Sequence, residues 1–181
     1  MTTTRLDIGR LCRLATPPAK PLEAGAAGGW PAVETALGTP LPADYKLFIA
    51  TYGTGLFDEF LYVFNPFAAD PDGNLLRQLD AARRGDAWSR AHFPDQARPA
   101  LVPAPGGLLP LGRTVNGDQL AWLTGGDPDG WPVVATASRS AEPERHELGL
   151  VAFLTLLFEG RLTTGVFPPE LGEDGHWFTP G

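Results

Sequence analysis

Hydrophobic residues spaced three and four positions apart predict two neighbouring helices in the first third of the chain. The first covers residues 30–37 and ends at Gly38, and the second begins near Pro42 and ends at Gly53. Proline is tolerated in a first helical turn, and glycine is favoured just after the last one. The second helix carries one apolar stripe, which predicts a buried face made of Tyr45, Phe48, Ile49 and Tyr52.

Two further helices are predicted later in the chain. One runs from Asn74 to about Ser89, with Leu75, Leu76, Leu79, Ala82 and Trp88 directed inward. The other covers residues 148–159 and is apolar on nearly all sides, which predicts a well-buried helix that ends at Gly160.

Between these helices the pattern changes to that of β-strands. Residues 60–64 and 131–137 are rich in aromatic and β-branched residues, and residues 108–111 and 118–124 flank Asn116-Gly117. Asn-Gly is the strongest short hairpin signal, because a type I′ turn needs a positive φ at both central residues. Asp-Pro-Asp-Gly segments at residues 70–73 and 127–130 predict type I turns. Helices, then antiparallel strands, then a helix predict an α+β fold.

The 181 residues suggest one domain with two extensions. Residues 1–29 are expected to form an arm and a Pro/Gly-rich linker, residues 30–160 the domain, and residues 161–181 a tail packed on it. A single cysteine, Cys12, and the lack of an apolar leader favour the cytoplasm. No apolar run approaches the roughly 20 residues of a membrane-spanning helix, so no membrane partner is expected.

Charge is distributed unevenly along the chain. The first twenty residues carry a net +3, while the whole chain carries −7, so the remainder carries −10. An acidic body argues against nucleic-acid binding and suits a basic protein partner. A mild acidic excess that simply keeps a protein in solution is the alternative explanation.

Candidate chemistry is sparse. Neither Asp-Pro-Asp-Gly segment has the closing glutamate of a calcium loop, because Ala81 and Ser138 stand there, and Cys12 and the three histidines show no zinc spacing. No metal or cofactor is therefore expected, and no phosphate-binding glycine motif is present. Asp58, Glu59 and Asp118 are the only residual signal for a carboxylate-dependent hydrolase, and the alternative is that they cap turns.

The order and spacing of several short motifs resemble the SUKH superfamily of Smi/Knr-type proteins. The motifs are Trp30, Leu37-Gly38, Leu41-Pro42-x-Asp44-Tyr45, Tyr52-Gly53-x-Gly55, Asn65-Pro66, Leu109-Pro110-x-Gly112-x-Thr114, Asn116-Gly117-Asp118, Trp122, Trp131-Pro132-Val133-Val134 and Phe153-Leu154 through Gly160. The resemblance covers roughly residues 30–160 and leaves residues 66–107 without a counterpart.

This resemblance implies helices packed on a curved antiparallel sheet and no enzymatic activity. It implies an immunity protein that neutralises a toxin, possibly a nuclease, of a polymorphic or contact-dependent system, or alternatively an intracellular regulatory adaptor. Loops rich in aromatic and acidic groups beside a rigid helix end are expected to hold the protein partner. These expected contact residues are Tyr52, Gly53, Gly55, Phe57, Asp58, Glu59, Asn116, Gly117 and Asp118.

Overall fold

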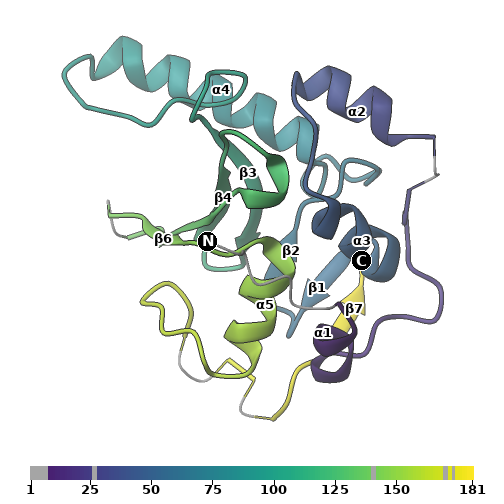
Figure 1. Ribbon diagram of the computed structural model, residues 1–181. Helices are drawn as coiled ribbons and strands as arrows, with labels where there is room; N and C mark the ends of the chain where they lie inside the picture. The colour runs from purple at the N-terminus through teal and green to yellow at the C-terminus, as the bar shows by residue number, and fades with distance from the viewer. Residues whose placement is uncertain (1–7, 26–27, 140–141, 169–170, 173) are drawn as a thin grey trace.

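The computed structural model describes residues 8–25, 28–139, 142–168, 171–172 and 174–181. Within these residues seven strands form one open antiparallel sheet in the order β6-β5-β4-β3-β2-β1-β7 (Figure 1). The predicted α+β class is confirmed. The strands are β1 (Gly55–Phe57), β2 (Leu61–Val63), β3 (Leu108–Thr114), β4 (Gln119–Leu123), β5 (Val133–Thr136), β6 (Glu144–His146) and β7 (Phe178–Pro180).

Five α-helices of the described residues accompany the sheet, and the positions of four of them, α2 to α5, follow the hydrophobic pattern closely. The predicted stripe of the second helix is buried in full, and Gly38 ends the first helix in the left-handed conformation with φ 74°. Seven of the nine residues of the last helix are buried, as its apolar surface predicts. The helices are α1 (Ile8–Leu14), α2 (Trp30–Leu37), α3 (Ala43–Tyr52), α4 (Leu75–His92) and α5 (Leu150–Phe158), with a short 3₁₀ helix η1 (Pro128–Gly130).

Helix α4 extends three residues beyond its predicted end, and one predicted inward residue is wrong. Asn74 caps the helix by accepting hydrogen bonds from the backbone N–H groups of Leu76 and Arg77. Leu75 and Leu79 are buried, whereas Trp88 is 57% exposed. The second half of α4 reaches past the sheet (Figure 1), so Trp88 has no core to enter.

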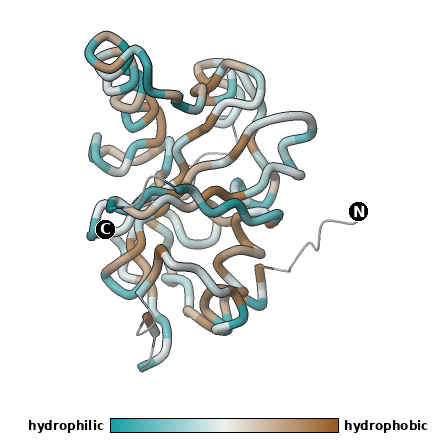
Figure 2. The backbone as a smooth tube through the Cα atoms, turned by 90° about the vertical axis from the view of Figure 1, so that its left-hand side faces the viewer, coloured by the Kyte–Doolittle hydropathy of each residue, from teal (hydrophilic) through white to brown (hydrophobic). Residues whose placement is uncertain are grey.

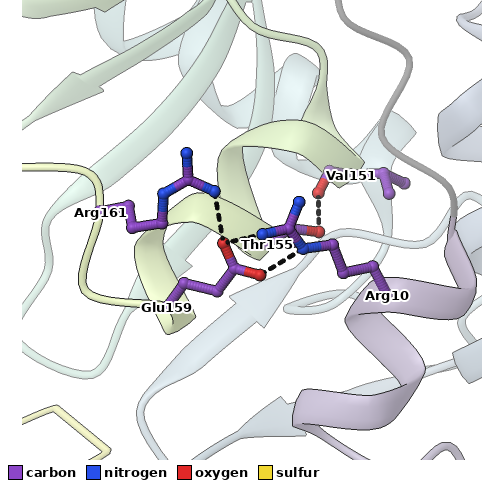
Figure 3. A network of polar contacts seen from close by, with 5 residues as sticks. All are labelled: Arg10, Val151, Thr155, Glu159 and Arg161. Carbon is purple, nitrogen blue, oxygen red and sulfur yellow. Dashed lines mark hydrogen bonds and ion pairs between the residues drawn. The ribbon is translucent and has the colours of Figure 1, made fainter.

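The segment predicted as an arm contains a helix whose side chains join the common core. Leu11 of α1 is fully buried. Arg10 forms a bidentate ion pair with Glu159, which directly follows α5 (Figure 3). Arg161 binds the same carboxylate at 3.2 Å. Residues 1–7 and 26–27 of the predicted arm and linker lie outside the described residues.

Two aspartates connect the helices to one another. Asp44 of α3 accepts a hydrogen bond from the backbone N–H of Val151 at 3.1 Å, which satisfies a donor in the first turn of α5. Asp129 of η1 likewise accepts a hydrogen bond at 2.7 Å from the backbone N–H of Ala43, the first residue of α3. Apolar segments lie mainly toward the interior and polar ones toward the outer loops (Figure 2).

In the described part of the chain no helix is both long and apolar enough to cross a membrane.

Candidate functional site

The two loops that sequence reasoning selected independently lie side by side. Strands β2 and β3 pair with Leu61 opposite Thr114, which places the β1–β2 turn beside the β3–β4 turn. The backbone N–H of Val115 in the second turn donates to the carbonyl of Phe60 in the first, at 3.0 Å. Sheet pairing therefore joins Asp58 and Glu59 with Asn116 and Gly117 at one end of the sheet.

The type I′ prediction for Asn116-Gly117 is wrong. Only Gly117 of this pair has a positive φ, 86°, and its N–H donates to the carbonyl of Thr114 at 3.0 Å. Thr114 also pairs with Asp118 across the turn, so the loop holds three residues and ends in a left-handed glycine. A three-residue loop needs the positive φ only at its last residue, and Asn116 is free to remain right-handed.

The strained turn is instead the one between β1 and β2. Asp58 and Glu59 have φ values of 53° and 52°, and the N–H of Phe60 donates to the carbonyl of Phe57 at 2.8 Å. Two successive positive φ values are the requirement of a type I′ turn, which normally favours Asn and Gly. Such a conformation costs a side-chain-bearing residue roughly 1–2 kcal/mol, so other contacts must hold this turn.

The Asp58 carboxylate supplies those contacts by binding the C-terminal segment. One oxygen accepts from the backbone N–H of Trp177 at 2.9 Å, and the other lies 2.7 Å from Nδ1 of His176. Nε2 of His176 lies 3.0 Å from the carbonyl of Phe158, the last residue of α5. The side chains of Asp58 and His176 are both buried, and the Phe158 ring stacks on the imidazole at a centroid distance of 4.1 Å.

Both imidazole nitrogens of His176 thus face oxygen acceptors. The arrangement joins the β1–β2 turn, the end of α5 and the strand β7 at one point.

Asp118 ties the β3–β4 turn to the segment after β5. Its carboxylate accepts from the hydroxyl of Thr114 at 2.7 Å and from the backbone N–H of Ser138 at 2.9 Å. Burial alone raises the pKa of Asp118, but these hydrogen bonds outweigh it and hold the pKa below its usual value. Asp118 is almost fully buried, so its predicted role in partner contact is replaced by a role in fixing the turn.

The remaining predicted contact residues lie inside the molecule. Tyr52 and Phe57 are buried and stack edge-to-face at 5.1 Å, and the Tyr52 hydroxyl donates to the carbonyl of Ala15 at 2.7 Å. Burial raises the pKa of Tyr52. Gly53 and Gly55 are buried where another backbone approaches, since a Cβ on Gly53 would lie 2.1 Å from the carbonyl oxygen of Leu22. Aromatic residues and glycines in a loop are therefore as compatible with a tightly packed interior as with an exposed binding surface.

A smaller exposed surface remains, which we call the turn rim. It consists of Glu59, Val115, Asn116, Gly117 and Trp177. Val115 is 64% exposed and Trp177 is 45% exposed, although both are large and apolar. The sequence did not predict Trp177 as a contact residue, because this residue reaches the rim only through the pairing of β7 with β1. A shallow hollow of about 460 Å³ lies beside the rim, lined in part by Asn116, Asp118, Arg139 and Pro168.

The three carboxylates considered for hydrolysis do not converge. Asp58 is occupied by His176 and Trp177, Asp118 by Thr114 and Ser138, and Glu59 points into exposed surface. Glycoside chemistry needs two carboxyl groups facing one bond. Among the described residues no group of three or more His, Cys, Asp or Glu side chains is arranged to hold a metal ion.

Fold and surface together define an α+β domain with an open antiparallel sheet and an exposed rim of turns at one end. Comparison with family models, with curated proteins and with solved structures finds no match for this chain.

Proposed function

We propose that the chain is a non-enzymatic protein-binding module that uses the turn rim to bind a basic partner. The observation that carries this proposal is the exposure of Trp177 and Val115 beside Glu59. These residues lie on turns that buried hydrogen bonds hold in place, such as the one from the N–H of Trp177 to Asp58. Aromatic anchors surrounded by polar groups dominate the energy of protein interfaces. A rigid backbone lowers the entropy lost when such a surface binds.

Within that class, the resemblance to the SUKH superfamily favours an immunity protein that neutralises a toxin, possibly a nuclease. The net charge of −7 suits a partner with a basic cleft, since opposite charges accelerate encounter. An intracellular regulatory adaptor of the Smi/Knr type would use the same surface. A cytoplasmic site of action belongs to both proposals and rests on the single cysteine.

The test is binding of the purified chain to the product of the adjacent coding region, where that product is a secreted protein with a variable C-terminal domain. Trp177→Ala should speed dissociation at least about tenfold, as for an interface anchor. Glu59→Lys should slow association in a salt-dependent way. Glu147→Lys is the matched control, because Glu147 is 71% exposed beyond β6 and the register places it away from the rim.

Three results separate the alternatives. Protection of cells that express the toxin, lost in Trp177→Ala, supports immunity. Binding without protection supports the adaptor. Unchanged kinetics in both rim variants would remove the rim from the proposal.

A further inference from the structure

The second half of α4 forms a projecting surface that the turn rim does not include. The buried side chains of this 18-residue helix, Leu75 and Leu79, both lie in its first turns. From Asp80 onward the helix has half-buried and exposed residues only, and it extends beyond the sheet (Figure 1). We call residues 80–98 the α4 arm; it comprises the end of α4 and the loop that follows.

An aromatic cluster covers the arm. Trp88 is 57% exposed and Phe93 is 47% exposed. The Trp88 ring stacks on His92 at 4.2 Å and meets Phe93 edge-on at 6.0 Å. Nδ1 of His92 lies 2.8 Å from the carbonyl of Trp88, which fixes the imidazole against the indole. The three rings therefore lie together at the end of α4, on a surface that no other described part of the chain covers.

Small residues share the outward face of the helix with Arg84, which is exposed four positions before Trp88. Ala81, Gly85 and Ala91 are exposed at helical spacing from Trp88, and no atom lies within 4 Å of a Cβ built on Gly85. Surface helices normally present long polar side chains on this face. Small neighbours leave the indole accessible to an approaching surface, and clustered exposed rings of this kind mark interaction sites.

Charge identifies the surface that fits the arm. Arg83, Arg84, Arg90 and Arg98 outnumber Asp80, Asp86 and Asp95 in the arm, which gives +1. The whole chain carries −7, so the rest carries −8. The acidic excess is concentrated after the arm, where residues 99–181 hold ten acidic and four basic side chains. Arg83 and Arg90 pair with Asp80 and Asp86 of the same helix. The arm keeps a net charge of +1, so the acidic body of another copy does not repel it, whereas two acidic bodies repel each other.

We infer that the α4 arm is a self-association surface, which packs its Trp88–Phe93 cluster on the acidic body of a second copy. A two-fold arrangement satisfies both arms at once, because each arm then contacts the body of the other copy. Single-stranded nucleic acid would also stack on exposed rings, but a net charge of +1 over 19 residues supplies few of the phosphate contacts on which such binding depends.

The test is sedimentation of the full chain over a wide concentration range, at low and at high salt. The wild-type chain should dimerise, and Trp88→Ala with Phe93→Ala should weaken the dimer at least about tenfold. Arg84→Glu should weaken the dimer at low salt and much less at high salt, because salt screens the attraction between the arm and the acidic body. Leu47→Ala is the matched control, since Leu47 is 48% exposed on α3 and should leave the dimer unchanged.

Two outcomes would overturn the inference. One is a chain that stays monomeric at every concentration. The other is a dimer that the Trp88 and Phe93 substitutions leave intact while circular dichroism shows a folded chain. Trp177 lies outside the arm, so loss of partner binding in Trp177→Ala and loss of the dimer in Trp88→Ala with Phe93→Ala are separate results, which keeps this inference distinguishable from the proposed partner surface.

Discussion

Asp58 and His176 form a buried pair, 2.7 Å apart, that connects residues 118 positions distant in sequence. Asp58 lies in a left-handed turn and His176 in the segment that leads into β7. The pair holds an unfavourable turn conformation and brings Trp177 to the surface beside it. The turn rim therefore depends on the chain's last residues.

Removing either partner of this pair should destabilise the fold strongly. Asp58→Ala and His176→Ala should each lower the free energy of unfolding by about 3–5 kcal/mol, because each leaves a buried polar group without its partner. The double variant should cost less than the sum of the two, which a double-mutant cycle in denaturant measures. His92→Ala is the control, and its exposed ring should cost little. Additive losses would show that the two side chains do not act as a pair.

The positive φ at Glu59 predicts a gain in stability from glycine. Glu59→Gly should raise the free energy of unfolding by about 1 kcal/mol, since glycine adopts a φ of 52° without steric cost. Glu59→Gln keeps the conformational cost and should leave stability nearly unchanged. Thermal or denaturant unfolding of both variants measures the difference. Equal stability of the two would argue that the turn is not strained.

Two glycines should respond to alanine in opposite directions. Gly53→Ala should destabilise by about 3 kcal/mol or more, because φ is 68° and the new Cβ would overlap the Leu22 carbonyl. Gly85→Ala should stabilise by about 1 kcal/mol, because it lies inside α4 with open space around it. Denaturant unfolding is the measurement. Loss of stability in Gly85→Ala would mean that the helix is distorted there.

Asp118 should make the fold sensitive to acid. Its pKa is lower in the folded chain than in the unfolded chain, so as pH falls the unfolded state takes up the proton first. The stabilisation is complete above the ordinary carboxyl pKa and is lost as pH falls through the lowered folded-state value. Asp118→Asn should therefore flatten the decline in stability between neutral pH and about pH 3. Asp72→Asn is the exposed control and should decline as the wild type does.

Much of the secondary structure followed from local pattern alone. The stripe from Tyr45 to Tyr52 and the proline before it predict α3 within a residue, because a buried face and a helix start are both properties of neighbouring residues. Trp88 fits the same apolar spacing in α4 yet is exposed, because the second half of the helix extends beyond the sheet. Spacing predicts which residues share a face but not whether a core lies opposite that face.

The candidate site was predicted only in part for a related reason. Sequence reasoning selected two acidic, aromatic turns, and pairing of β2 with β3 brings them together. It took Tyr52 and Phe57 as contact residues, whereas both are core, and it could not find Trp177 or the role of His176. The positions of His176 and Trp177 depend on β7 pairing with β1, and a three-residue strand far along the chain leaves no local signal of its partner. The apolar stripe of α3 already predicted that Tyr52 is buried, which conflicts with a contact role.

The sequence by itself determined the class of fold, the α-helices from α2 to α5, the hairpin around Asn116-Gly117 and the acidic character of the body. Periodicity, turn chemistry and charge are short-range or additive properties, so they can be read from neighbouring residues. Only the tertiary structure decided which turn is strained, which carboxylates are buried and which tryptophans remain exposed. Those outcomes depend on contacts between distant segments, above all Asp58 with His176.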